Sequence, residues 1–171
     1  MTPRKILFCT DFSENSEPAR NLAVEYAKAF GAQLLIAHVI DSNSFPDYVD
    51  WVGEEHYADW KDEALKQILK RTQEYVKDRL ESLESECAKG VEQVKTCCRI
   101  GLPSKEIVAL AEKESVDLIV VGTHGRTGVK HLVMGSISRS VLKTAHRPVL
   151  IVEAPPGKGE SSEGPYEFPV P

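Results

Sequence analysis

A glycine-rich segment is the part of the chain whose residue types best suit ligand chemistry. Gly122, Gly125 and Gly128 recur at three-residue intervals after an apolar run, and Gly135-Ser136 precedes helix-like sequence. Glycines allow backbone amides to approach an anion without a Cβ in the way, and a helix that begins near Gly135 would point its unpaired N–H groups at the same anion. The segment therefore predicts a phosphate-binding loop between a strand and a helix, and so a nucleotide ligand.

The spacing of these glycines differs from that of the two most familiar nucleotide loops. No Gly-Lys-Ser/Thr closes the segment as in a P-loop, and the order is G-x-x-G-x-x-G instead of G-x-G-x-x-G. Two glycines separated by two residues, followed after nine residues by Gly-Ser, form the pattern of ATP-binding members of the universal stress protein family, which this sequence resembles. A loop that only links a strand to a helix is the alternative interpretation.

Asp11 is the acidic residue best placed to act with this loop. It follows the apolar run 6–9, which is typical of a buried parallel strand, so its carboxylate should lie at the carboxyl end of the sheet. There it could accept a hydrogen bond from a ribose hydroxyl or help to hold a divalent ion bound by phosphates. A helix cap, or a loop residue that binds no ligand, is an equally good interpretation of an aspartate at this position.

Basic and histidine side chains near the glycines offer less specific chemistry. Arg126, Lys130 and Arg139 could complement phosphate charge, although Arg139 could equally be solvated. His124 and His131 are seven residues apart, a separation that suits no metal-binding pattern, and solvent-facing side chains are expected.

Composition and charge argue against a nucleic-acid-binding or membrane-bound protein. The chain has 171 residues, 42% of them hydrophobic, and a net charge of −5, which suits one domain and offers no basic patch for nucleic acid or an anionic membrane. The first residues lack the apolar core and cleavage site of a signal peptide, and no stretch reaches membrane-spanning length. The expected compartment is the cytoplasm, with neither nucleic acid nor membrane as a partner.

The four cysteines indicate neither a zinc site nor a disulfide framework, because none has paired C-x-x-C spacing. Cys97 and Cys98 should point to opposite faces of a strand, one into the core and one toward solvent or a covering helix. A redox switch is the minor hypothesis for this pair.

Alternating strand and helix patterns would position the candidate residues. The order βαβαβαβαβ predicts an α/β fold with a parallel sheet and helices on both faces. A Pro- and Gly-rich stretch ends the chain, so residues 1–153 are expected to form the domain and residues 154–171 a disordered tail. The predicted strands are 6–9, 33–40, 91–100, 117–121 and 148–152, and the predicted helices are 13–30, about 54–88, a short helix from 103, and 136–145.

The family resemblance covers about residues 3–153. Residues 5–13 look like the family's opening strand and acidic turn, residues 117–125 like its fourth strand, and residues 147–152 like its last strand. It implies an open, Rossmann-like sheet of five parallel strands in the order 3-2-1-4-5, similar to the adenine nucleotide alpha hydrolase fold. One departure is Cys9, where many relatives carry proline.

The resemblance also implies a ligand and a homodimer. The ligand would be ATP, with ADP or AMP as alternatives, and Mg²⁺ or Mn²⁺ as the metal. Asp11 would contact the ribose or, through phosphates, the metal, and Val39 would face adenine with its backbone. The other implied nucleotide-binding positions are Thr10, Gly122, Gly125, Arg126, Gly135, Ser136, Ile137 and Ser138.

The implied homodimer would form through the last strand, at Val149, Leu150, Ile151 and Val152, since an edge strand leaves backbone groups unpaired.

These residues favour a nucleotide-dependent regulatory dimer of the stress response, with an unidentified protein as a possible receiver of the signal. An ATP hydrolase or phosphotransferase would need a group that orients a nucleophile, and no such group is evident beside the glycines, so any hydrolysis should be slow. A phosphoacceptor receiver domain would need an Asp after the third strand and a Lys after the fifth, and neither appears. A dimeric scaffold without nucleotide is the remaining alternative.

Overall fold

The sheet has five parallel strands, and its order confirms the sequence prediction. The computed structural model describes residues 2–44, 57–123 and 134–154. Within them the strands lie in the order β3-β2-β1-β4-β5, and every neighbouring pair is parallel. The strands are β1 (Lys5–Cys9), β2 (Gln33–Asp41), β3 (Val94–Gly101), β4 (Leu118–Gly122) and β5 (Val149–Val152).

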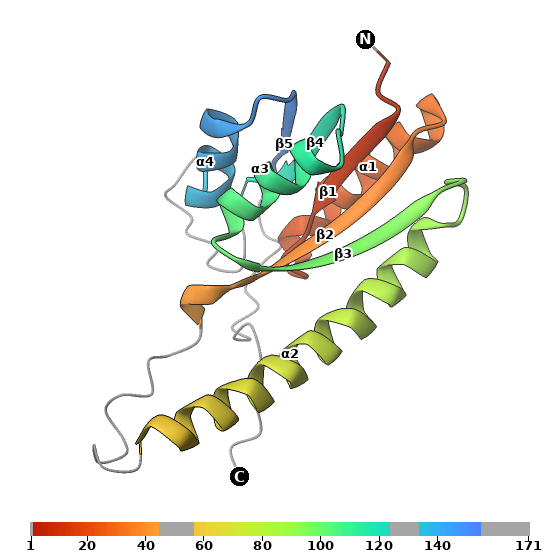
Figure 1. Cartoon of the computed structure of the whole chain (residues 1–171). Helices are drawn as coiled ribbons and strands as arrows, with labels where there is room; N and C mark the ends of the chain where they lie inside the picture. The colour runs from red at the N-terminus through yellow and green to blue at the C-terminus, as the bar shows by residue number, and fades with distance from the viewer. Residues whose placement is uncertain (1, 45–56, 124–133, 155–171) are drawn as a thin grey trace.

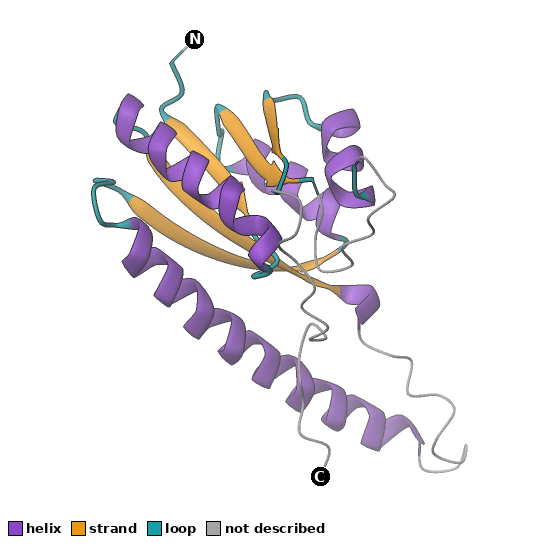
Figure 2. Ribbon diagram, turned by 180° about the vertical axis from the view of Figure 1, so that it is seen from behind, coloured by secondary structure: helices purple, strands orange, loops and turns teal. Residues whose placement is uncertain are grey.

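Helices cover both faces of this sheet, as Figure 1 and, from behind, Figure 2 show. They are α1 (Glu17–Phe30), α2 (Tyr57–Cys87), α3 (Pro103–Lys113) and α4 (Ser136–Thr144). One core joins α1 and α2 to one face of the sheet, and a second core joins α3 and α4 to the other. The α/β class with helices on both faces is thereby confirmed.

The central strand β1 is buried on both faces. Ile6 and Phe8 belong to the core beneath α1 and α2, whereas Leu7 belongs to the core beneath α3 and α4, and all three side chains are fully buried. A strand covered on both faces must be apolar throughout, which explains the unbroken run in the sequence. At the edges, β3 alternates between half-buried and exposed residues and all four β5 residues are half-buried, so the predicted edge position of the third strand is confirmed.

The first helix begins later than the sequence predicts and ends where the sequence predicts. The predicted start at Ser13 is too early, because Ser13 precedes a short 3₁₀ turn, η1 (Glu14–Ser16). The helix α1 begins at Glu17, with Ser16 at its N-cap position and Pro18 in its first turn. Gly31 ends the helix at φ +60°, a left-handed conformation that glycine adopts without strain, as predicted.

The third strand begins later than the sequence predicts. Gly90 turns the chain at φ +101°, and Val91, which the alternating pattern places in the strand, instead packs as a buried residue in the α1–α2 core. Ladder pairing with β2 starts only at Val94, opposite Leu34. Hydrophobic alternation alone does not separate such an anchor residue from the strand that follows.

The second helix is the longest element of the molecule. Its 31 residues give it a length of roughly 46 Å, and Figure 1 shows that it runs beyond the end of the sheet. Thr72, Val76 and Leu80 are buried at helical spacing against the sheet, with exposed residues between them. This stripe confirms the amphipathic pattern in the sequence.

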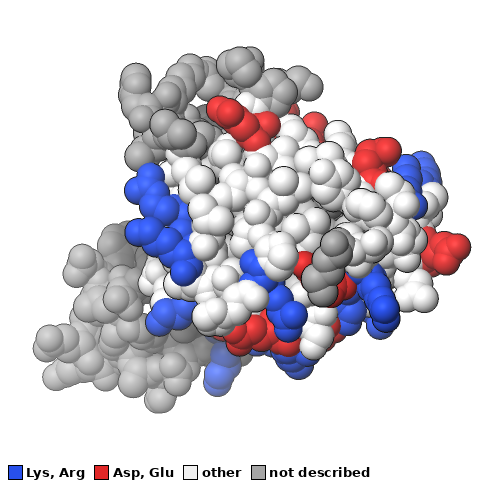
Figure 3. Space-filling model, turned by 90° about the horizontal axis from the view of Figure 1, so that it is seen from above, with Lys and Arg blue, Asp and Glu red and all other residues white. Residues whose placement is uncertain are grey.

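Charged side chains of both signs occur on the face shown in Figure 3, around a largely uncharged middle. None of the helices in the described part of the chain is both long enough and apolar enough to cross a membrane.

Asp117 ties the beginning of β4 to the beginning of β1. Its Oδ2 atom accepts hydrogen bonds from the N–H groups of Arg4, at 2.8 Å, and Lys5, at 3.0 Å. These bonds favour the charged carboxylate and lower the pKa of Asp117. The contact joins two neighbouring strands that are more than one hundred residues apart in sequence.

Replacement of Asp117 by Asn should lower the free energy of unfolding by about 1 kcal/mol at pH 7, because the charge-assisted hydrogen bonds are weakened. Since the folded-state pKa is depressed, this stabilisation is present above the unfolded-state pKa of about 3.9 and is lost as the pH falls through the folded-state value. Urea unfolding of wild type and Asp117→Asn at pH 7 and near pH 3 measures the effect. The difference should shrink at the lower pH, and an equal difference at both pH values would contradict the assignment.

Candidate functional site

The candidate residues meet where the strand order reverses. From β1 the chain crosses to β2 through α1 on one face, whereas α3 leads into β4 across the other face, so the crossovers diverge between β1 and β4. In open parallel sheets ligands bind at such a point, beyond the carboxyl ends of the strands. The structure places Thr10 and Asp11 directly after β1 and Thr123 directly after β4.

Asp11 lies in a turn that its own carboxylate organises. The Oδ1 atom accepts hydrogen bonds from the Ser13 N–H, at 3.1 Å, and from the Ser13 hydroxyl, at 2.6 Å. Asp11 is half-buried. The residue at the cap position of η1 is Ser13, so the helix-cap interpretation of Asp11 is wrong, and Asp11 is a turn residue whose contact with a ligand stays a prediction.

Thr10 also forms hydrogen bonds within this turn, residues 10–13, which is called the acidic turn below. The residue is buried, its Oγ1 atom accepts a hydrogen bond from the Phe12 N–H at 2.9 Å, and it lies 3.1 Å from the Ser16 hydroxyl. Ser16 in turn donates to the Ser13 carbonyl at 2.8 Å. The Thr10 side chain therefore fixes the shape of the acidic turn.

The strand β2 extends past the end of β1 and presents its main chain there. The β1–β2 register ends at Cys9 opposite Ala37, and the Thr10 N–H then donates to the Ala37 carbonyl at 2.9 Å. Main-chain groups of alternate residues in a strand point to the same side, so those of Val39 point toward β1 beyond its last paired residue. The Val39 side chain packs against the α3–α4 core. This arrangement leaves the main-chain N–H and carbonyl of Val39 facing the space beyond the end of β1.

The described ends of the glycine-rich loop are joined to each other. The Gly135 N–H donates to the Thr123 carbonyl at 2.7 Å, and the Thr123 N–H donates to the Val152 carbonyl at 2.8 Å. Gly135 is the extended residue that caps α4, and no side chain accepts a hydrogen bond at that cap. The first N–H groups of an α-helix have no acceptor within the helix, and here they lie at the end of β4.

The side chains of the first α4 residues differ in their roles. Ser136 and Ile137 are exposed, whereas Ser138 is buried and its hydroxyl donates to the Gly122 carbonyl at 2.6 Å. A hydroxyl has one proton to donate, and that of Ser138 goes to Gly122. Ser138 could therefore donate to an anion through its main-chain N–H. Arg139 donates to the Met134 carbonyl at 3.1 Å, so this side chain braces the start of the helix.

Several predicted residues lie outside the described part of the chain. They are Gly125, Arg126, Gly128, Lys130 and both loop histidines, His124 and His131. Within the described residues, no group of three or more His, Cys, Asp or Glu side chains could hold a metal ion, so a metal at Asp11 would need further ligands from phosphates or water.

The cysteines lie in the sheet and at the end of α2. Cys97 packs partly into the α3–α4 core while Cys98 is exposed, which matches the prediction that the pair divides between the two faces. Desolvation is the largest cause that raises the pKa of each thiol, and for Cys98 the pKa rises to about 11. These thiols are protonated at neutral pH.

Sequence reasoning missed the contribution of His38 and Phe12. His38 is 2% exposed, its Nδ1 atom donates to the Thr10 carbonyl at 2.8 Å, and its ring stacks on Phe12 with the ring centroids 4.4 Å apart. The one signal in the sequence is a histidine among apolar strand residues. That signal does not reveal that the histidine contacts Thr10 and Phe12. Together the two side chains pack against the acidic turn on the α1–α2 side of the sheet.

Comparison with known proteins agrees with this architecture. The model for the universal stress protein family matches residues 2–153. The chain belongs to the universal stress protein family. Universal stress protein MJ0531 of Methanocaldococcus jannaschii is 36% identical over 157 residues, which cover 89% of this chain and 83% of the relative. Universal stress protein MJ0577 of the same organism is 31% identical, with 88% and 94% coverage.

Solved structures of universal stress proteins share the fold. The structure of MJ0577 superposes with a TM-score of 0.72 over 91% of this chain and 99% of that one, at 31% identity. A universal stress protein in complex with cAMP gives a TM-score of 0.62 at 23% identity, with 90% and 98% coverage. One from Archaeoglobus fulgidus in complex with dAMP gives 0.59 at 19% identity, with 90% and 100% coverage. The resemblance seen in the sequence is thereby confirmed at the level of family and fold.

In this universal stress protein, Ser138→Ala should destabilise the fold by about 1–2 kcal/mol, because the half-buried Gly122 carbonyl loses its donor. Ser140→Ala on the same helix is the control, since Ser140 offers its carbonyl to Thr144 and that bond does not depend on the side chain. Thermal and urea unfolding of the three proteins measure the effect. Equal stability of Ser138→Ala and Ser140→Ala would contradict the role given to the Ser138 hydroxyl.

Proposed function

We propose that this universal stress protein binds ATP between the acidic turn, β2 and the start of α4, and that it works in the cytoplasm as a nucleotide-dependent regulatory homodimer of the stress response. The observation that carries the proposal is the Gly135–Thr123 hydrogen bond, which holds the N-terminus of α4 at the end of β4. There β4 also contacts η1, the turn that follows Asp11. An anion and a sugar hydroxyl could be bound at this one place.

Each segment of the crevice suits a different part of ATP. The main-chain groups of Val39 match the donor and acceptor pattern of an adenine edge, and Asp11 is placed to accept from a ribose hydroxyl. The N–H groups of Ser136, Ile137 and Ser138, at the positive end of the α4 dipole, suit phosphates. In this proposal Gly122, Gly125 and Gly135 let the main chain approach the phosphates, Arg126 adds positive charge, Thr10 shapes the turn, and Mg²⁺ or Mn²⁺ would bind the phosphates beside Asp11.

The fold itself accommodates adenine nucleotides in other universal stress proteins, since two of the structures compared above are complexes with cAMP and dAMP. We propose ATP as the ligand because the glycine-rich sequence and the N-terminus of α4 would offer several main-chain donors for a polyphosphate. ADP and AMP are the nearest alternatives. Hydrolysis is expected to be slow at most, because the sequence identifies no group that orients a nucleophile toward the γ-phosphate.

Replacing Gly135 or Gly125 by Val should abolish ATP binding, because a branched side chain would occupy the phosphate path. Ala88→Val is the control, since the exposed Ala88 lies just beyond the end of α2. Isothermal titration with ATP and Mg²⁺ should give saturable binding to wild type and to Ala88→Val, and at least a hundredfold weaker binding to the glycine variants. Wild-type affinity in both glycine variants would refute the site, and no nucleotide binding by wild type would favour a nucleotide-free scaffold.

The dimer would form through the outer edge of β5, which pairs with no other strand among the described residues. The carbonyls of Pro148 and Val152 accept hydrogen bonds from β4, so by strand alternation the main-chain groups of Val149 and Ile151 point away from the sheet. The side chains of Leu150 and Val152 pack with the α1–α2 core, and those of Val149 and Ile151 with the α3–α4 core. An edge strand of apolar residues whose outward backbone groups have no strand partner within the described part of the chain favours pairing with a second copy.

Ile151→Pro should convert the dimer to a monomer, because proline removes an outward N–H while the inward hydrogen bonds to β4 stay available. Analytical ultracentrifugation measures the mass, and circular dichroism checks that the sheet persists. Leu150→Pro, which would remove an inward N–H, is the matched variant and should unfold the edge of the sheet. A dimeric, folded Ile151→Pro would place the interface elsewhere.

A further inference from the structure

Phe12, immediately after Asp11, has an unusual backbone conformation. Its φ is +63°, in the left-handed region that bulky side chains rarely adopt. Residues held in sparsely populated conformations persist when their surroundings over-determine them, and they cluster at functional sites. The contacts that hold Phe12 therefore indicate what fixes the acidic turn.

Strand β2 supplies the first of these contacts through His38. The rings of Phe12 and His38 stack with a centroid separation of 4.4 Å and an interplanar angle of 25°. The buried imidazole is itself fixed, because its Nδ1 atom donates to the Thr10 carbonyl at 2.8 Å. His38 thus holds the turn on both sides of Asp11, by its hydrogen bond to Thr10 and by its ring against Phe12.

Helix α2 supplies the second contact through Arg79. The Arg79 guanidinium carbon lies 5.4 Å from the centroid of the Phe12 ring, within the range of a cation–π interaction. Phe12 also packs against the α1–α2 core, which includes Val76, one turn before Arg79. The same aromatic ring is therefore in contact with the longest helix of the molecule and adjoins the aspartate of the proposed ribose site.

We propose that Phe12 is a positioning residue that couples α2 to the nucleotide site. Held between His38 and Arg79, it keeps the chain in the left-handed conformation that sets the direction of the Asp11 carboxylate. Binding at Asp11 and the packing of α2 then influence each other through the Phe12 ring, as thermodynamic linkage requires. The inference rests on the proposed nucleotide binding and adds the element that responds to it.

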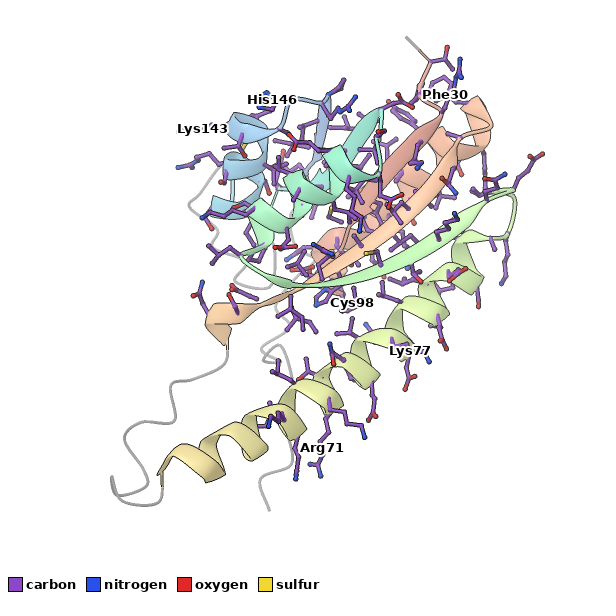
Figure 4. All side chains as sticks on the ribbon, in the orientation of Figure 1. Phe30, Arg71, Lys77, Cys98, Lys143 and His146 are labelled. Atoms are coloured by element: carbon purple, nitrogen blue, oxygen red, sulfur yellow. The ribbon has the colours of Figure 1, made fainter. Side chains whose placement is uncertain are left out.

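The shape of α2 suits a responding element. It extends beyond the sheet in Figure 1, so its far part has no sheet beneath it, and a small change of tilt at Arg79 would move that part by a larger distance. Figure 4 shows Arg71, eight residues before Arg79, projecting from α2 away from the sheet. Arg71 is exposed and supplies a matched arginine with no described contact to the turn.

The first test compares ATP affinity in variants of Phe12. Phe12→Leu keeps an apolar side chain but removes the aromatic face, and it should weaken ATP binding about tenfold, within the range of typical coupling energies. Phe12→Tyr keeps the ring and should bind within about twofold of wild type. Urea unfolding establishes the conditions under which all variants are folded. Wild-type affinity in Phe12→Leu would overturn the positioning role, as would an equal loss in Phe12→Tyr.

The second test needs no nucleotide. Amide hydrogen exchange should be faster in peptides covering residues 10–16 of Arg79→Ala than in wild type or Arg71→Ala, because the turn loses its contact with α2. When ATP and Mg²⁺ are added, exchange in α2 around residue 79 should change in wild type and in Arg71→Ala but not in Arg79→Ala. Unaltered exchange of residues 10–16 in Arg79→Ala would overturn the coupling.

The two experiments separate the inference from the function on which it rests. A wild-type protein that binds no adenine nucleotide would refute the proposed function, and with it the coupling to a nucleotide. A wild-type protein that binds ATP, with unchanged affinity in Phe12→Leu and unchanged exchange in Arg79→Ala, would refute only the role of Phe12.

Discussion

The hydrogen bond from the Thr10 N–H to the Ala37 carbonyl is the last one between β1 and β2, and the candidate site depends on where it falls. Beyond it β1 gives way to a turn while β2 continues for four residues, paired with β3 alone. The main chain of β2 is thereby left facing the space above β1. Parallel pairing of β4 on the other side of β1, together with the Gly135–Thr123 hydrogen bond, brings the start of α4 to the same space.

Most of the described polar side chains around this space form hydrogen bonds within the protein. The hydroxyls of Ser13, Ser16 and Ser138 donate to a carboxylate or to carbonyls, and the Thr10 hydroxyl accepts from a main-chain N–H. Such bonds rigidify a loop because each polar group that lost its partner would be desolvated without compensation. Among the described residues, the N–H groups at the start of α4 are donors left toward a ligand, and their positions follow from the backbone and require no side-chain ordering on binding.

Much of the fold was predictable because it depends on local patterns. The apolar run of β1, the glycine that ends α1 and the repeated alternation of strand and helix each carry a short-range signal, and parallel topology follows from the alternation. The start of β3 was not predictable, since Val91 has the residue type and spacing of a strand but packs as an anchor after Gly90. For the site, the sequence indicated Asp11 and Gly135 by position, whereas the contacts of Phe12 with His38 and Arg79 join three separate elements and have no local signal.

The raised pKa values of the cysteines have a practical consequence. Thiols react with maleimides and with peroxide as thiolates, so Cys9, Cys87, Cys97 and Cys98, whose pKa values are all raised, should be slow to react at neutral pH. A cysteine introduced at an exposed position such as Lys77, with 74% of its side chain accessible, would be modified first. Site-selective fluorescent or spin labels could then be placed on α2, and Cys98, the exposed natural thiol, is the cysteine to replace first.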